Sequence, residues 1–185
     1  MKNTYSEPTF ITRFIDIKML TNRHLLLLMW LGSITLILIA LYMQYFMGLE
    51  PCALCMTQRI FIIAVGVIAL LAWLHNFVRP SRRLHLKIYS VFGMLLAIIG
   101  GGFSLRHLWL QSLPEDLVPA CGPSLGYLID TVPFVEAFTT LLQGDGHCAD
   151  VSWSLLGLTI PGWTLVTFIG FFLIYAFISS RAFRR

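Results

Sequence analysis

Charged side chains are scarce in this chain of 185 residues. Asp, Glu, Lys and Arg together make up 12% of the sequence, well below the roughly 25% that is typical of soluble domains. Hydrophobic residues make up 57%. The shortage of charge excludes an ordinary water-soluble globule, and the abundance of apolar residues excludes an intrinsically disordered chain. The composition therefore predicts a membrane protein.

Four windows contain no Asp, Glu, Lys or Arg: residues 24–49, 60–78, 88–105 and 151–180. A helix of about 20 apolar residues is long enough to cross a bilayer. Pro161 interrupts the last window, and the part that follows it is still long enough. We predict an all-α polytopic membrane protein, a four-transmembrane-helix bundle. Its expected spans are about 24–47, 57–78, 88–107 and 162–180. The first window is too long for a cleavable signal peptide.

The basic residues assign a side to each connecting segment. All Lys and Arg residues except Arg59 and Arg106 lie before the first span, between the second and third, or after the fourth. The positive-inside rule makes that face cytoplasmic, which predicts a multi-pass membrane protein with both termini in the cytoplasm. The expected division is a cytoplasmic segment 1–23, a membrane domain 24–181 and a tail 182–185, with a cytoplasmic loop 79–87 and periplasmic loops 48–56 and 108–161. The positive net charge thus orients the chain and indicates no nucleic-acid partner.

The long periplasmic loop has one segment with a helical pattern. Asp130 or Thr131 can cap a helix with Pro133 in its first turn. Four apolar side chains would then share one face: Val135, Phe138, Leu141 and Leu142. This pattern predicts a short amphipathic helix on the membrane surface. A loop helix packed on the protein is the alternative.

All four cysteines lie on the predicted periplasmic side: Cys52, Cys55, Cys121 and Cys148. That side allows disulfides, whereas the cytosol does not. Two residues separate Cys52 from Cys55, so this pair closes only a small, reducible ring. Cys121 and Cys148 are then left to pair across the long loop.

Three interpretations of the cysteines are open. Two structural disulfides are one, although a ring as small as Cys-x-x-Cys constrains little of the unfolded chain. A metal site formed by the four cysteines, with His147 or His107 in reserve, is the second. Thiol–disulfide exchange is the third, and Arg59 favours it. Arg59 lies four residues after Cys55, on the same helical face, and both a guanidinium and a helix N-terminus favour the reactive thiolate. Arg106 is the other basic residue outside the cytoplasmic segments. It either has a functional role or extends its side chain to the outer lipid headgroups.

Several motifs resemble one protein family. They are Pro-Cys-Ala-Leu-Cys-Met-Thr-Gln-Arg at 51–59, His-Leu-Trp-Leu-Gln at 107–111, Ala-Cys-Gly-Pro around Cys121, and, after Cys148, Trp-Ser-Leu-Leu-Gly-Leu-Thr-Ile-Pro-Gly-Trp at 153–163. Together with the four spans they resemble the DsbB family, the bacterial inner-membrane disulfide bond formation proteins. The resemblance covers most of the chain from about residue 24.

The resemblance implies an electron relay. A Cys121–Cys148 disulfide would take electrons from a reduced periplasmic thioredoxin-fold protein of the DsbA type, with Cys121 forming the mixed disulfide. The loop pair would then reduce Cys52–Cys55. A membrane quinone, ubiquinone or menaquinone, would be the final acceptor. The implied activity is that of a protein-dithiol:quinone oxidoreductase with no resident metal.

The same resemblance assigns roles beside the quinone. Cys55 would engage it as a thiolate, Arg59 would lie next to it, and His107 would hydrogen-bond to it. The alternative is that His107 is an interfacial histidine whose hydrogen bonds are made to groups other than the quinone. Two departures from the family pattern stand out, because Gly122 and Pro123 follow Cys121 and Gln58 replaces an acid that some relatives carry. Alternatives for the whole protein are a metal-binding or structural disulfide-bonded tetraspan, or a quinone reductase like vitamin K epoxide reductase, in which the Cys-x-x-Cys follows the loop pair.

Overall fold

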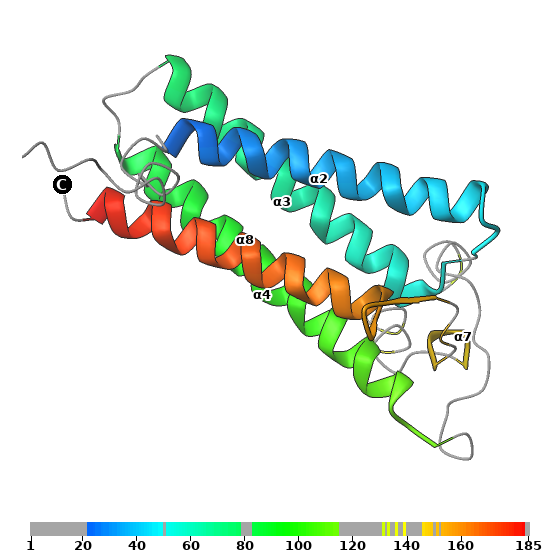
Figure 1. Cartoon of the computed structure of the whole chain (residues 1–185). Coiled ribbons are helices and arrows are strands. Elements are labelled where there is room, and N and C mark those ends of the chain that lie inside the picture. The colour runs from blue at the N-terminus through cyan, green and yellow to red at the C-terminus, as the bar shows by residue number, and fades with distance from the viewer. Residues whose placement is uncertain are drawn as a thin grey trace, which may run out of the picture.

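The computed structural model describes residues 22–49, 51–78, 83–114, 131, 133, 136, 139, 146–149, 151 and 153–183. Four long helices run side by side in the described part of the chain (Figure 1): α2 (Asn22–Tyr45), α3 (Ala53–Val78), α4 (Arg83–Gln111) and α8 (Ile160–Phe183). Each is long and apolar enough to cross a membrane. The predicted four-transmembrane-helix bundle is confirmed.

The helix ends place two predicted site residues at the same end of the bundle. The helix α3 begins at Ala53, earlier than the predicted start at about 57, so Cys55 lies in its first turn. The helix α4 continues to Gln111, so His107 lies about one turn before its end. Because α3 and α4 are antiparallel neighbours, the start of one meets the end of the other (Figure 1).

The helices do not pack equally against one another. The α4–α8 contact is the most extensive, followed by α3–α4 and α2–α3, whereas α2 barely touches α8. A central core joins all four helices through apolar side chains such as Met29, Val65, Ala97, Phe168 and Tyr175. Hydrogen bonds also cross between helices, as membrane helices commonly allow. Ser33 Oγ donates to the Ile62 carbonyl at 2.6 Å, and Tyr175 Oη donates to the Val65 carbonyl at 3.0 Å.

Two glycines let α4 approach α8 closely. A Cβ atom at Gly93 would collide with the Tyr175 ring, and one at Gly100 would collide with the Phe168 ring. The two glycines are seven residues apart, close to two helical turns, so they lie on one face of α4. Small residues at such positions are a common device in membrane helix packing.

We expect Gly100→Leu to separate α4 from α8. Overpacking of this kind lowers the free energy of unfolding by about 1–3 kcal/mol, and thermal unfolding in detergent measures it. Gly102→Leu is the matched control, because a Cβ at Gly102 meets no atom of the described residues within 4 Å. Equal loss of stability in the two variants would contradict the packing role of Gly100.

A small hairpin leads directly into α8. Its strands are β1 (Ser154–Leu155) and β2 (Leu158–Thr159), paired antiparallel with Ser154 opposite Thr159. Leu156 and Gly157 have φ angles of 53° and 78°, and two positive φ values define the tight type I′ turn that suits a hairpin. The hairpin lies within the segment 108–161, which the sequence pattern assigns to a loop.

The rest of the long loop is described only in part. A short helix, α7 (Gly146–Ala149), contains Cys148 and packs near the ends of α3 and α4. Of the predicted amphipathic helix, Thr131, Glu136 and Thr139 are helical and Pro133 is not. Its apolar face lies outside the described residues and stays a prediction.

Candidate active site

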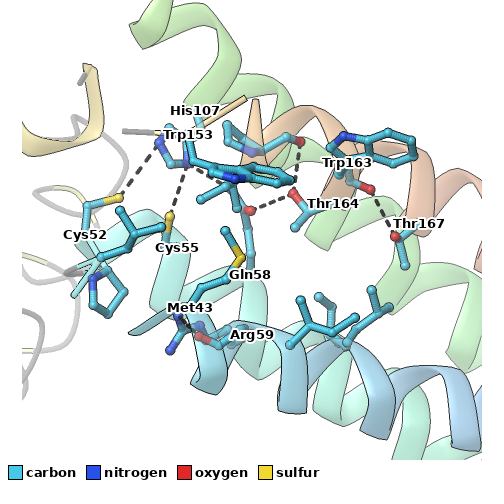
Figure 2. A pocket seen from close by; sticks show the side chains of 18 of the residues that line it. Met43, Cys52, Cys55, Gln58, Arg59, His107, Trp153, Trp163, Thr164 and Thr167 are labelled. Atoms are coloured by element: carbon cyan, nitrogen blue, oxygen red, sulfur yellow. Dashed lines mark hydrogen bonds between the residues drawn. The ribbon is translucent and has the colours of Figure 1, made fainter. Parts of the chain in front are cut away.

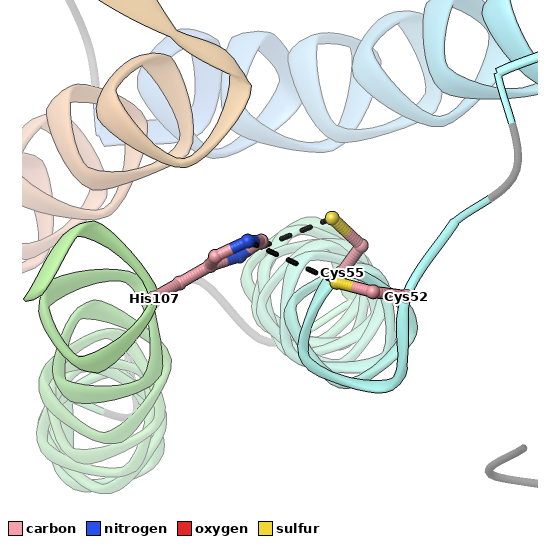
Figure 3. A group of neighbouring side chains, drawn as sticks. All are labelled: Cys52, Cys55 and His107. Atoms are coloured by element: carbon pink, nitrogen blue, oxygen red, sulfur yellow. Dashed lines mark hydrogen bonds between the residues drawn. The ribbon is translucent and has the colours of Figure 1, made fainter. Parts of the chain in front are cut away.

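The Cys-x-x-Cys pair meets a buried histidine where α3 begins and α4 ends. Cys52 Sγ lies 3.8 Å from His107 Nε2, and Cys55 Sγ lies 3.9 Å from His107 Nδ1. Figure 3 shows the imidazole extending from α4 toward both sulfur atoms. The histidine is only 2% exposed, while both cysteines are partly buried. One ring therefore contacts both thiols of the predicted redox pair.

A chain of polar side chains holds this imidazole from behind. Gln58 Nε2 lies 3.2 Å from His107 Nδ1. Thr164 Oγ1 donates to Gln58 Oε1 at 2.7 Å (Figure 2), and Ser104 Oγ lies 3.1 Å from Thr164 Oγ1. Gln58 is 1% exposed. The chain links α3, α4 and α8, and a satisfied buried network of this kind makes a site rigid.

Sequence reasoning missed most of this network. It recorded Gln58 only as a departure from the family pattern and assigned no role to Ser104 or Thr164. Each is a polar residue in a membrane-spanning helix, and that is a usable signal because buried polar groups at membrane depth need partners. The sequence cannot show which partners they find.

Arg59 is held from the opposite side of the site by α2. Its Nη1 donates to Gln44 Oε1 at 2.6 Å, and its Nη2 donates to the Ala40 carbonyl at 3.3 Å. Met56 Sδ lies 3.8 Å from Nη1. The guanidinium is thus fixed in place by a neighbouring helix. Arg106 differs, because its guanidinium lies 4.1 Å above the Trp109 ring on its own helix.

The sulfurs, the imidazole and the guanidinium line one cavity of about 350 Å³. Most of its wall is apolar and comes from α2, α3, α8 and the hairpin, including Ile37, Met43, Leu155, Trp153 and Trp163. Figure 2 shows the two tryptophans on the side nearest α8 and Arg59 on the side nearest α2. A mostly apolar cavity with a few convergent polar groups is typical of a small-molecule site. Its chemistry suits a lipid-soluble molecule that carries polar atoms.

Cys148 lies beside the same site. It is fully buried and clusters with Leu54, Phe103 and Leu110, and Cys52 packs against this cluster. It is also close enough to interact electrostatically with Cys55 and His107. Cys121 lies outside the described residues, so its pairing with Cys148 stays a prediction.

Three donor atoms in the site are close enough together to hold a metal ion. Among the described side chains, the donor atoms of Cys52, Cys55 and His107 lie within 4.8 Å of one another. This set differs from the predicted four-cysteine site, because it contains two of those cysteines and the histidine held in reserve.

Comparison with known proteins agrees with the predicted resemblance. The sequence model of the family described as "Disulfide bond formation protein DsbB" matches residues 22–178. A protein of Saccharophagus degradans named "Disulfide bond formation protein B" is 52% identical over 153 residues, covering 83% of this chain and 90% of the relative. A protein of Hahella chejuensis with the same name is 47% identical over 158 residues, covering 85% and 93%. The chain, a multi-pass membrane protein by its four helices, therefore belongs to the DsbB family of disulfide bond formation proteins.

Proposed function

We propose that the protein is a protein-dithiol:quinone oxidoreductase that reoxidises a periplasmic thiol oxidase of the DsbA type. One observation carries the proposal: Cys55, Arg59 and His107 line the same apolar cavity at the start of α3. Structural disulfides have no need of a cavity that contains a cation and an imidazole. A thiol that passes electrons to a lipid-soluble acceptor needs both a cavity and polar groups at the point of transfer.

The first half of the reaction is thiol–disulfide exchange. A thiolate of the reduced partner attacks Cys121 of a Cys121–Cys148 disulfide, forms a mixed disulfide and releases Cys148 as a thiolate. The second partner thiol then resolves the mixed disulfide, and the partner leaves oxidised. The loop pair is now a dithiol, which reduces a Cys52–Cys55 disulfide by the same chemistry. The burial of Cys148 in the cluster against which Cys52 packs supports direct exchange between the pairs.

In the second half of the reaction, the Cys52–Cys55 dithiol gives up two electrons and two protons and becomes a disulfide. A bound quinone supplies an acceptor for two electrons and two protons. Cys55 presents its sulfur to the cavity, and Cys52 closes the disulfide by attacking that sulfur as the electrons leave. The Arg59 guanidinium can stabilise negative charge that develops on an oxygen in the cavity. The His107 imidazole lies within reach of both sulfurs and can hold a thiol proton.

The proposed location is a bacterial inner membrane with both termini in the cytoplasm. The start of α2 and the end of α8 lie together at the end of the bundle opposite α7 (Figure 1). Arg23 and Arg181 mark that basic end. The positive-inside rule supports a cytoplasmic assignment for it and leaves the cysteine site in the periplasm.

Turnover with purified components tests the proposal. The protein in detergent, with a reduced DsbA-type partner and a soluble ubiquinone or menaquinone analogue, should consume one quinone for every two partner thiols oxidised. Quinone absorbance and thiol titration measure the two quantities. Partner oxidation that proceeds at the same rate without quinone would contradict the proposal.

A further inference from the structure

We infer that the reduced Cys52–Cys55 pair and His107 form a redox-gated binding site for a thiophilic divalent cation such as Zn²⁺. The inference goes beyond the proposed function, because binding needs neither quinone nor partner. Two thiolates and one imidazole are donors that zinc prefers, and Cys-x-x-Cys is a common spacing in zinc sites.

The donor atoms are already close to the geometry that zinc requires. Zinc binds sulfur at about 2.3 Å and nitrogen at about 2.0–2.1 Å in a tetrahedral arrangement, which places sulfur and nitrogen ligands about 3.5 Å apart. Cys52 Sγ and His107 Nε2 are 3.8 Å apart. The three donor atoms all lie within 4.8 Å of one another. Small side-chain rotations of the two cysteines therefore complete the set.

The surroundings of His107 suit a metal ligand. A ligating histidine usually hydrogen-bonds through its other ring nitrogen, which fixes the ring and its tautomer. Gln58 occupies that place, 3.2 Å from Nδ1. A half-turn of its side-chain amide would bring the carbonyl oxygen, which here accepts from Thr164, to an Nδ1 proton and leave Nε2 free for the ion, while Thr164 keeps its bond to the Pro161 carbonyl. The three ligands line the cavity, so the fourth coordination position is open to water, as in accessible rather than structural zinc sites.

The oxidation state of the pair controls the site. A Cys52–Cys55 disulfide offers no thiolate, so only the dithiol binds the ion. Binding displaces up to two thiol protons and transfers no electron. The ion takes the sulfur atoms that the proposed relay uses, so it should block quinone reduction until a chelator removes it. This inhibition rests on the proposed function, whereas the binding itself does not.

A titration of the Cys121→Ser/Cys148→Ser double variant tests the site. These substitutions remove the loop thiols, so bound Zn²⁺ must use Cys52 and Cys55. In detergent without quinone, competition with a chromophoric chelator should show one Zn²⁺ per reduced chain. Oxidation of the remaining pair should weaken binding at least about 100-fold, because the thiolate ligands are lost. Cd²⁺ should add the absorption band of a thiolate–cadmium bond to the reduced form only.

Histidine variants in the same background identify the third ligand. His107→Gln should weaken Zn²⁺ binding at least about tenfold, whereas His24→Gln should not, because His24 is exposed on α2. Cys52→Ser gives a second variant should His107→Gln fail to fold. Binding that survives oxidation, or is lost in the double variant, or responds equally to both histidine changes, would overturn the inference. Turnover with quinone in the absence of Zn²⁺ is measured separately, so failure of the relay and failure of the metal site are distinguishable.

Discussion

Cys55→Ser should abolish quinone-dependent oxidation of the partner, with a loss of at least about 1,000-fold in turnover. A serine hydroxyl keeps the shape of the side chain at the start of α3 but cannot form a disulfide with Cys52. Loss of a covalent nucleophile typically costs several orders of magnitude. Quinone absorbance during turnover with reduced partner measures the effect.

The same variant should separate the two halves of the relay. A Cys121–Cys148 disulfide is untouched by the change, so a single equivalent of partner should still be oxidised before the reaction stops. Thr57→Ser is the matched control, because Thr57 lies on the same turn and its hydroxyl donates to the Ala53 carbonyl of its own helix. Full turnover of Cys55→Ser would rule out the proposed mechanism.

Arg59→His should weaken quinone use far more than partner use. The guanidinium reaches the cavity because Gln44 and Ala40 of α2 hold it there, and an imidazole is too short to make the same bonds. A hydrogen bond to a charged group contributes about 1.5–3 kcal/mol. Loss of such a bond between the guanidinium and a quinone oxygen should therefore raise the KM for quinone about 10- to 100-fold. The KM for the partner should change less than about twofold, since in the proposed relay the partner reacts at the loop cysteines.

Arg106→His is the control for this experiment. It makes the same chemical change near the outer end of another helix, where the guanidinium lies over Trp109. Steady-state kinetics with each substrate varied in turn gives both KM values. If Arg59→His and Arg106→His leave the KM for quinone equally unchanged, Arg59 serves only to anchor the helix at the interface.

Much of the fold could be predicted because membrane helices are set by local composition. Each of the four charge-free windows overlaps one of α2, α3, α4 and α8, since each helix satisfies its own backbone and needs no distant partner to form. The helix boundaries differ more, because α3 becomes helical at Ala53 and α4 runs from Arg83 to Gln111, beyond both ends of the expected span. Apolar content does not indicate the start of α3, because Thr57, Gln58 and Arg59 are polar or charged.

The site was predictable only where its residues are neighbours in sequence. Cys55 and Arg59 were linked by helical spacing, and both line the cavity. The contact of His107 with both sulfurs joins segments more than 50 residues apart, and only the resemblance indicated a role for it. The bonds of Arg59 to α2 depend on how α2 packs against α3. The spacing of apolar residues in the sequence does not indicate this packing.

The uneven packing of the bundle divides the site into two separately supported halves. The sulfurs and the imidazole stand on α3 and α4, which the Gln58–Thr164 bond ties to α8. The groups that hold the Arg59 guanidinium belong to α2, which packs mainly on α3 and scarcely on α8. A shift of α2 would move the Gln44 and Ala40 groups that bind the Arg59 guanidinium. The contacts of His107 with the two sulfurs do not involve α2. The thiol–imidazole contacts and the Arg59 guanidinium thus have different mechanical supports within the bundle.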